Sequence, residues 1–513
     1  MTLATDQPPK GDQDKEVTSY NDEGRLGYSP SQIDENSTDE ELLAYQIDPV
    51  EKKALVRRLD MFIAPMVGIL YLISFLDRGN VGNASVGGMF VDIGAPSNGL
   101  SVATSIFYAT YVLFEPFWTS VMKILRPSRM LPIVVVLWGG VVLGNGFIEN
   151  YASLLALRLL LGLLESSLTP CLFLAITVFY QRDELALRTS YMFVSAAVSG
   201  VVGGLIGAGL IEMNGTHGLA GWQWLYIVEG AITIGIGFLC FFFIADDPEH
   251  AWYLSPRQKL LMRVRDLQAR EFTGSKEFSW AEVRKAFTEP IVYISGLVQF
   301  FYDTQSQLTT TSTVYGFSTF LVVIVKELGY NTLNSQLLTA PVYFVAAVVY
   351  VGGAYICDKY DVRYWLLLPS GLVTIVGYAL LIGVQHSTGV KLFACFLAGF
   401  GIYISVGMHV SWLNSNVAGI RKRSTAIGLQ QLMGNCGGIL AGQVYRAQDK
   451  PYYRLGHAVS LGAGVLALLF LTLEVYVLRS RNARKLAMSE EEKRAQDAAG
   501  VTGDRHWSFK YVW

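Results

Sequence analysis

Residues 59–86 read LDMFIAPMVGILYLISFLDRGNVGNASV, a run that is long and apolar enough to cross about 30 Å of hydrocarbon as one helix. An adjacent charged pair, Asp77 and Arg78, interrupts this run well inside it. A charge inside a membrane costs about 2.5 to 3.5 kcal/mol per residue even on lenient insertion scales, so such residues are by default functional. We therefore expect a binding or proton-relay site beside this membrane-spanning helix.

A second charged pair, Arg158 and Glu165, lies in another apolar run. Seven residues make nearly two helical turns, so these two side chains share a helix face. In the first run, Asn80 lies on the same face as Asp77, whereas Arg78 is turned about 100° away. Both runs therefore present ionisable groups toward neighbouring helices.

The composition is that of a polytopic membrane protein. Of 513 residues, 52% are hydrophobic and 16% are charged, which is more apolar sequence than a soluble surface can hide. The net charge of −2 gives no indication of nucleic acid as a partner. The five cysteines lie in apolar runs without metal or disulfide spacing, and no phosphate-binding Walker loop is present. We expect no metal, no organic cofactor and no ATP-driven pump.

Twelve apolar runs are long enough to span a membrane, and they form two sets of six. Matched halves of this kind are typical of internally repeated transporters. The runs lie near 59–86, 99–122, 130–149, 151–180, 189–213 and 223–245, then 291–325, 335–357, 364–385, 390–414, 424–446 and 455–479.

The distribution of charge divides the chain further and predicts its orientation. Lys and Arg concentrate in both terminal segments and in the even-numbered connections, so both termini are predicted to be cytoplasmic. The predicted segments are a disordered tail (1–57), an N-terminal six-helix bundle (58–245), a cytoplasmic linker with a helix on the bundle (246–290), a C-terminal six-helix bundle (291–479) and a second tail (480–513).

Several polar side chains in the spans suit an anionic ligand. A guanidinium that keeps its charge holds a carboxylate with two hydrogen bonds, so Arg78 is the first choice for binding one. Asp77 and Glu165 are the proton-coupling candidates, because a buried carboxylate near a cation can change its protonation when that neighbour moves. Further candidates that line the path are Asn80, Arg158, Tyr302, Asn414 and Asn435, together with the polar stretch 303–313.

Structural interpretations of the same residues stay open at this point. Asp77 and Arg78 can form an internal ion pair that fixes helices, and Arg158 and Glu165 can form a purely structural bridge. Either arrangement uses the residue types that a transport site uses.

Four passages resemble the major facilitator superfamily, and within it the anion:cation symporters of the fungal allantoate permease group. They are FLDRGNVGNA (75–84), the span from Arg158 to Glu165, PSR (127–129), and WLNSN (412–416) with RKR (421–423). The first of these is the specific one. The superfamily's G-x-x-x-D-R-x-G-R-R loop signature is not readable after the second span, where VMKILRPSR (121–129) stands instead.

This resemblance implies an all-α membrane protein of twelve helices in two six-helix bundles, the major facilitator fold, with inverted repeats within each half. It also implies alternating access and movement of small organic anions with protons. In these roles Asp77 and Glu165 carry protons, Arg78 holds the substrate carboxylate, and Arg158 matches the arginine of the fourth span.

The function predicted from the sequence is proton-coupled uptake of a carboxylate such as allantoate, nicotinate or pantothenate. We expect a permease rather than an enzyme, acting as a monomer in the lipid bilayer of a fungal plasma membrane. The coupling ion is the proton. An exporter of toxins or secondary metabolites and a non-transporting nutrient sensor are the alternatives.

Overall fold

The structure of the chain is a computed structural model that describes most of its residues. The described residues are 19–20, 26–27, 33–34, 37–121, 126–273, 280–308, 321–322, 325–326, 329–360, 362–384, 387–418, 420–444, 454–499, 501 and 503–513. Residues 309–313 of the polar stretch, and most of the second half of the seventh predicted span, lie outside this set.

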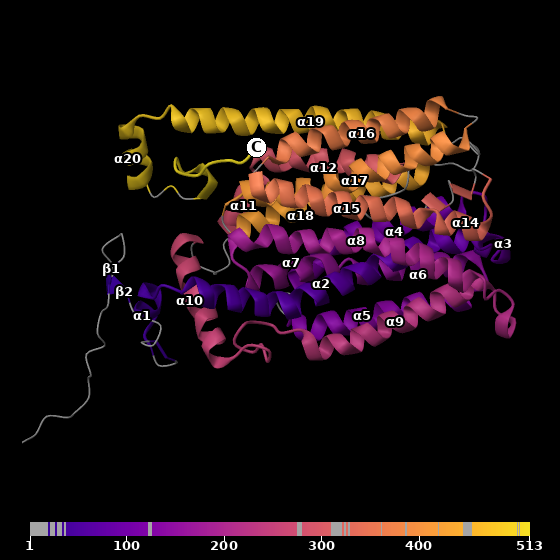
Figure 1. The fold of residues 1–513 in the computed structure, drawn as a ribbon, viewed down its shortest axis with the longest axis horizontal. Helices are drawn as coiled ribbons and strands as arrows, with labels where there is room; N and C mark the ends of the chain where they lie inside the picture. Colours follow the sequence, from indigo (N-terminus) through magenta and orange to yellow (C-terminus); the bar gives the residue numbers. More distant parts are fainter. Residues whose placement is uncertain are drawn as a thin grey trace, which may run out of the picture.

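The N-terminal set of long helices forms one layer of the molecule, drawn in indigo to magenta in Figure 1. These helices are α2 (Pro49–Val86), α4 (Gly99–Val121), α5 (Pro127–Gly144), α6 (Tyr151–Glu165) with α7 (Leu168–Phe179), α8 (Arg182–Ile211) and α9 (Gly221–Phe243). Shorter elements are the antiparallel pair β1 (Ser19–Tyr20) and β2 (Leu26–Gly27), the helices α1 (Asp39–Ala44) and α3 (Met89–Asp92), and the 3₁₀ turns η1 (Asn145–Phe147) and η2 (Thr216–Gly218).

The C-terminal set forms the second layer, drawn in orange to yellow (Figure 1). Its helices are α12 (Pro290–Leu308), α14 (Thr332–Leu337), α15 (Thr339–Tyr360), α16 (Arg363–Gly383), α17 (Thr388–Asn416), α18 (Ile420–Val444) and α19 (Arg454–Leu486). Two helices, α10 (Pro256–Thr273) and α11 (Trp280–Phe287), connect the sets, and α20 (Glu490–Ala498) and the turn η4 (Gly503–Arg505) follow α19.

Ten helices of the described chain are long and apolar enough to cross a membrane. They correspond to ten of the twelve predicted spans. The other two predicted spans contain α12 and α18, whose buried side chains include polar residues such as Gln299, Asp303, Gln430 and Asn435. These helices pack side by side within the C-terminal set, so their polar groups face protein rather than lipid.

Two differences from the predicted boundaries concern the first tail and the fourth span. The predicted disordered tail 1–57 contains α1 and the first turns of α2, because Asp48 caps α2 through the Val50 N–H (3.0 Å) and Pro49 occupies the first helical position. The fourth predicted span breaks after Glu165. There the Ser166 and Ser167 hydroxyls donate to the Leu163 and Leu164 carbonyls (2.8 Å each) within the last turn of α6.

The linker helix α10 packs against the N-terminal segment, so these two parts of the chain form one assembly at the end of the molecule that we call the tail end (Figure 1). Arg257 of α10 donates to Glu51 (3.1 Å) and to the Tyr45 hydroxyl (2.8 Å). Arg265 forms a buried ion pair with Glu184 at the start of α8. The predicted helix on the bundle is therefore present within 246–290.

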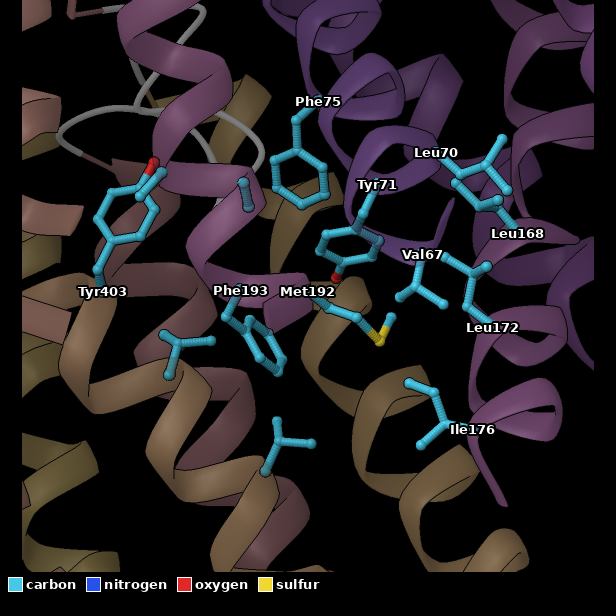
Figure 2. Close-up of a cluster of buried hydrophobic side chains, with 14 of the residues drawn as sticks. Val67, Leu70, Tyr71, Phe75, Leu168, Leu172, Ile176, Met192, Phe193 and Tyr403 are labelled. Atoms are coloured by element: carbon cyan, nitrogen blue, oxygen red, sulfur yellow. The ribbon is translucent and has the colours of Figure 1, made fainter. Parts of the chain in front are cut away.

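A tightly packed apolar cluster joins α2 to its neighbours at mid-height. Figure 2 shows the tilted rings of Tyr71 and Phe75 of α2 next to each other, with Phe193 of α8 beside them. The ring centroids of Tyr71 lie 4.7 Å from Phe75 and 6.2 Å from Phe193. Leu168 and Leu172 of α7 pack on the other side of α2 (Figure 2). This packing fixes the rotation of α2 and hence the direction of its polar face.

The two sets meet where α8 packs on α15 and α4 packs on α18 (Figure 1). On α8, Gly200 faces the Tyr343 ring, and any side chain on Gly204 would meet the Thr339 hydroxyl at 2.7 Å. Near the end opposite the tails, Lys326 donates to the Val86 carbonyl (2.8 Å). The sets are therefore in close contact at this far end.

Residues 503–513, which we call the C-terminal strap, lie across the tail end of the C-terminal set. Trp412 and Asn416 of α17 both donate to the Val512 carbonyl (2.7 and 2.9 Å), and the Asn416 oxygen accepts from the Val512 N–H (2.8 Å). Asp504 forms a buried ion pair with Lys422 of α18 (2.7 Å). The strap is thus held by backbone hydrogen bonds and by a buried charge pair.

Replacing Gly401 by alanine is expected to destabilise the C-terminal set. At this crossing of α16 and α17, an added methyl group would overlap the Thr374 hydroxyl and the Ser370 carbonyl, and the carbonyl belongs to a rigid backbone. Overpacking of this kind costs about 1 to 3 kcal/mol. Thermal unfolding of the purified protein measures the loss. Gly428→Ala in α18, where nothing lies within 4 Å, is the matched control and should not lower stability.

Candidate functional site

The polar face of α2 meets a carboxylate from α6 in the interior of the N-terminal set. Arg78 Nε donates to Glu165 Oε1 in an ion pair whose partners are 3% and 0% exposed. The Ser74 hydroxyl, one turn before Arg78, donates to the same oxygen. The second oxygen of Glu165 has no hydrogen-bond partner among the described residues. The negative charge of the buried Glu165 therefore balances the positive charge of Arg78.

Aromatic rings surround the Arg78 guanidinium. Its Cζ lies 4.8 Å from the centroid of Tyr111, 5.3 Å from Phe75 and 5.6 Å from Phe107. A cation at this distance over a ring face is stabilised by the ring quadrupole, more strongly where water is excluded. The rings also hold the planar guanidinium group in place, and they form an apolar wall of the site.

A second group of polar side chains lies beside the first and includes Asp77. Asn80 Nδ2 donates to Glu229 of α9 (2.6 Å) and to Asp77 (3.4 Å), and the Thr233 hydroxyl donates to the other oxygen of Asp77 (3.4 Å). All four side chains are buried. Within the described part of the chain, neither carboxylate forms an ion pair with a basic residue. Charge balance in this group therefore calls for a bound proton or cation.

The two ion pairs that the sequence left open as structural bridges, Asp77–Arg78 and Arg158–Glu165, are not formed. Arg158 Nη2 donates to the Tyr226 hydroxyl of α9 (3.1 Å) rather than to Glu165. The two residues share a face of α6, but seven residues separate them by about 10 Å along the axis, so each contacts a different neighbour. Asp77 and Arg78 point about 100° apart and likewise take separate partners. The structural bridges considered from the sequence are therefore wrong in their pairing.

The remaining predicted site residues are distributed over the C-terminal set. Asn435 of α18 donates to Glu115 of α4 (3.2 Å), and this hydrogen bond links the two sets. Glu115 follows Tyr111 by one helical turn. Tyr302 of α12 is buried, with its ring centroid 5.9 Å from that of His409. Asn414 is half-buried near the tail end of α17. The structure thus brings Arg78, Asp77, Asn80 and Glu165 together, and it places Tyr302 and Asn414 elsewhere.

Several residues of the site are absent from the sequence prediction. Ser74 has a signal, because it precedes Arg78 by one turn and so shares its face. Glu229 has one too, since it is an acidic residue within an apolar run. The aromatic neighbours Phe107 and Tyr111 have none, because α4 carries many aromatic residues and only packing selects the two that face Arg78.

Comparison with known proteins agrees with this architecture. Residues 67–442 match the model of the Major Facilitator Superfamily. An uncharacterized transporter of Schizosaccharomyces pombe is 39% identical over 87% of this chain and 90% of its own length. The high-affinity nicotinic acid transporter of Saccharomyces cerevisiae is 31% identical over 97% of this chain and 94% of its own length.

Among solved structures, a bacterial homologue of the human lysosomal transporter Spinster, in an inward-facing and occupied conformation, has a similar fold. The TM-score is 0.60 at 14% sequence identity, with 85% of this chain and 98% of that chain covered. The predicted fold class, an all-helical membrane protein with the major facilitator fold, is confirmed. The chain belongs to the major facilitator superfamily and is a multi-pass membrane transporter rather than an enzyme.

Proposed function

We propose that this transporter imports a small organic anion together with protons, as the anion:cation symporters of the allantoate permease group do. The observation that carries the proposal is the buried Arg78–Glu165 ion pair, enclosed by Tyr111, Phe75 and Phe107. A guanidinium is the side chain best suited to hold a carboxylate with two parallel hydrogen bonds. In this structure the Glu165 carboxylate accepts from Arg78 Nε, at the place that a substrate carboxylate would take.

Coupling follows from competition for one guanidinium. When Glu165 takes up a proton, it no longer balances the charge of Arg78, and a substrate carboxylate can replace it. Asp77, which shares Asn80 with Glu229, is the second proton-binding group. With protons and anion bound, the buried site is close to neutral, which lowers the cost of moving it between the two sides of the membrane. Release of the anion then lets Glu165 lose its proton and pair with Arg78 again.

Nicotinate is the first substrate to test. The related nicotinic acid transporter supports it, and so does the aromatic wall around Arg78, which would pack against a pyridine ring. Allantoate and pantothenate carry the same carboxylate without the aromatic ring. A panel of the three therefore separates recognition of the carboxylate from recognition of the ring.

We further propose that the chain acts as a monomer in a plasma membrane with both termini in the cytoplasm. The basic connections support this orientation. The tail end of Figure 1 then faces the cytoplasm, and the contact between Lys326 and Val86 lies on the outer side. The described arrangement would be the one closed to the outside.

Glu165→Gln tests the proposal, because glutamine resembles a permanently protonated glutamate. Accumulation of radiolabelled substrate driven by external pH near 5 should fall at least about tenfold, since the energy of the proton gradient is no longer captured. Exchange of labelled for unlabelled substrate needs no net proton movement and should continue. Uptake is measured in cells at external pH near 5 and near 7, normalised to the amount of protein at the surface.

The matched control is Glu149→Gln, the same substitution at an exposed position before α6. It should leave uptake and its pH dependence unchanged. Absence of saturable uptake of any carboxylate by the wild type, with the protein at the surface, would contradict the proposed import and favour export or sensing. Full accumulation by Glu165→Gln would remove Glu165 from the coupling mechanism.

A further inference from the structure

A second buried polar cluster lies within the C-terminal set, around His409 of α17. His409 is 0% exposed and Glu474 of α19 is 1% exposed. The His409 Nε2 atom lies 3.1 Å from Glu474 Oε2 and 3.3 Å from the Ser295 hydroxyl, and the Nδ1 atom lies 3.0 Å from Gln299 Oε1 and 3.2 Å from Gln430 Nε2. Three helices, α12, α18 and α19, thus contribute side chains around the imidazole ring of α17 in the membrane interior.

The neighbours of His409 determine which of its atoms carry protons. Gln299 Nε2 donates to the Asp303 carboxylate (3.0 Å), and this contact fixes the orientation of the Gln299 amide. Gln299 therefore turns its oxygen toward His409 Nδ1, and that nitrogen must carry a hydrogen. Gln430 Nε2 also contacts the Ser295 hydroxyl (3.0 Å), which can donate as well as accept, and the Gln430 oxygen has no partner among the described residues. The Gln430 amide is therefore able to turn, so that its oxygen accepts from both Ser295 and this N–H.

With Nδ1 protonated, the contact between Nε2 and Glu474 requires a second proton. Without it, the lone pair of a neutral imidazole would face a negatively charged oxygen at 3.1 Å. With it, the pair is either an imidazolium and a carboxylate or a neutral imidazole and a carboxylic acid. Both forms have no net charge. Loss of the proton leaves one uncompensated negative charge at a fully buried position.

The other ionisable groups around His409 do not supply a positive charge that would balance Glu474. Asp303 of α12 acts through Gln299, Tyr302 of α12 lies with its ring at 72° to the imidazole ring, and α18 contributes the neutral Gln430. These neighbours add acidic or neutral groups and no base. A proton from water is therefore what balances Glu474.

We propose that His409 and Glu474 form a second proton-binding site, which loads and releases one proton in each transport cycle. This inference rests on the proposed proton coupling and adds a site in the C-terminal set to the one around Arg78. In the step itself, one proton from water bonds to Nε2 or to Oε2, and the same bond breaks when the site meets the other side of the membrane. No other reactant takes part.

A series of contacts between neighbouring residues leads from this site toward the N-terminal set. The Asp303 carboxylate fits against Gly434 of α18, where any added methyl group would overlap it. The next residue, Asn435, donates to Glu115 of α4 (3.2 Å), one turn from the Tyr111 ring that stacks on Arg78. These contacts connect the proton site to the interface between the sets. Movement of one set against the other would therefore act on the residues of the site.

The accumulation ratio of substrate in proteoliposomes tests the proposal. At zero membrane potential, each coupled proton multiplies the limiting ratio about tenfold per unit of pH difference. We expect His409→Gln and Glu474→Gln each to lower this ratio about tenfold at a difference of one pH unit, while exchange of labelled for unlabelled nicotinate continues. Vesicles without protein give the background from passive entry of the weak acid.

His457→Gln is the matched control, because His457 is also a buried histidine of the C-terminal set but lies outside this cluster. It should leave the ratio unchanged. An unchanged ratio in His409→Gln and Glu474→Gln, with wild-type accumulation intact, would overturn the second site alone. Wild-type accumulation that does not respond to the pH difference would instead overturn the proposed proton coupling.

A spectroscopic measurement on the wild-type protein tests the proposal even where the variants fail to fold. Nitrogen-15 NMR of labelled histidines in the wild-type protein reports the protonation of each ring nitrogen, and the chain has six histidines to resolve. We expect the His409 signal to show a protonated Nδ1 at pH near 5. A neutral ring with a proton on Nε2 alone would overturn the proposal.

Discussion

Replacing Arg78 by lysine should reduce carboxylate uptake by about 30-fold to several thousand-fold, with the protein still present at the membrane. Removing one partner of a buried, hydrogen-bonded charge pair costs about 2 to 5 kcal/mol, which is the source of this range. Lysine keeps the charge but has a compact ammonium group, so it loses the two-pronged contact and the stacking on Tyr111. Arg78→Ala should have at least the same effect.

The measurement is initial uptake of nicotinate and allantoate at several concentrations, normalised to surface protein. Arg129→Lys, the same substitution at an exposed arginine of α5, is the control and should transport normally. Uptake by Arg78→Lys within a factor of two of the wild type would exclude Arg78 from substrate binding.

A paired substitution distinguishes substrate binding from a purely structural ion pair. Replacing a buried ion pair by apolar residues is often neutral or stabilising, so Arg78→Met combined with Glu165→Met should fold. If the pair only fixes helices α2 and α6, this double variant should transport. We expect a stable protein without carboxylate uptake, as measured by thermal unfolding and by the same uptake assay.

The second large effect concerns the C-terminal strap. Lys422→Met should destabilise the protein by about 3 to 5 kcal/mol, because it leaves the buried carboxylate of Asp504 without its ion-pair partner, whereas Glu289 keeps Arg481 (2.6 Å). Lys422 Nζ lies 2.7 Å from Asp504 and 3.1 Å from Glu289, and all three side chains are nearly inaccessible. Thermal unfolding of the purified protein measures the loss, and limited proteolysis should cut the strap earlier than in the wild type.

Lys359→Met, at the exposed end of α15, removes the same charge without a buried partner and should change stability little. Equal stability of Lys422→Met and the wild type would show that the buried pairs contribute no net energy.

The same network makes stability depend on pH. Burial alone would raise the pKa of Glu289, but Lys422 and Arg481 hold it below its ordinary value of 4.5. Because the folded state has the lower pKa, this contribution is complete above pH 4.5 and is lost as the pH falls through the folded-state value. The unfolding temperature should therefore decline below that pH, and by less in Lys422→Met.

Particular residues show how far the sequence determines this architecture. Long apolar runs are interpretable one by one, because each helix must satisfy its own backbone within the membrane. The ends of helices are harder to predict from the sequence. The break after Glu165 depends on two serines whose hydroxyls donate to carbonyls of their own helix, and serine is common in membrane spans. The start of α2 at Pro49 does have a local signal, in the Asp-Pro pair that caps it.

The site illustrates a different limit. That Asp77, Arg78 and Glu165 are unusual follows from their charge in an apolar run. Which of them pair does not follow, because the partner of each is set by how α2, α6 and α9 are rotated against one another. His409 illustrates the same limit: a lone histidine in a span is unremarkable in sequence, and only the side chains that α12, α18 and α19 place around it mark it as part of a site.

The way the strap is held has a consequence for how the protein can diverge in evolution. Trp412 and Asn416 contact the backbone of Val512, Asn482 contacts the backbone of Tyr511 (2.8 and 3.0 Å), and Lys485 donates to the carbonyls of Asp504 and Phe509 (2.7 and 2.8 Å). These contacts are made to backbone atoms of the strap, so they do not depend on which side chains the strap carries. Apart from Asp504, which pairs with Lys422, and the buried Tyr511, the strap can therefore change its side chains and keep its path. A strap in a distant relative is better sought from the helix residues that bind its backbone than from the strap's own sequence.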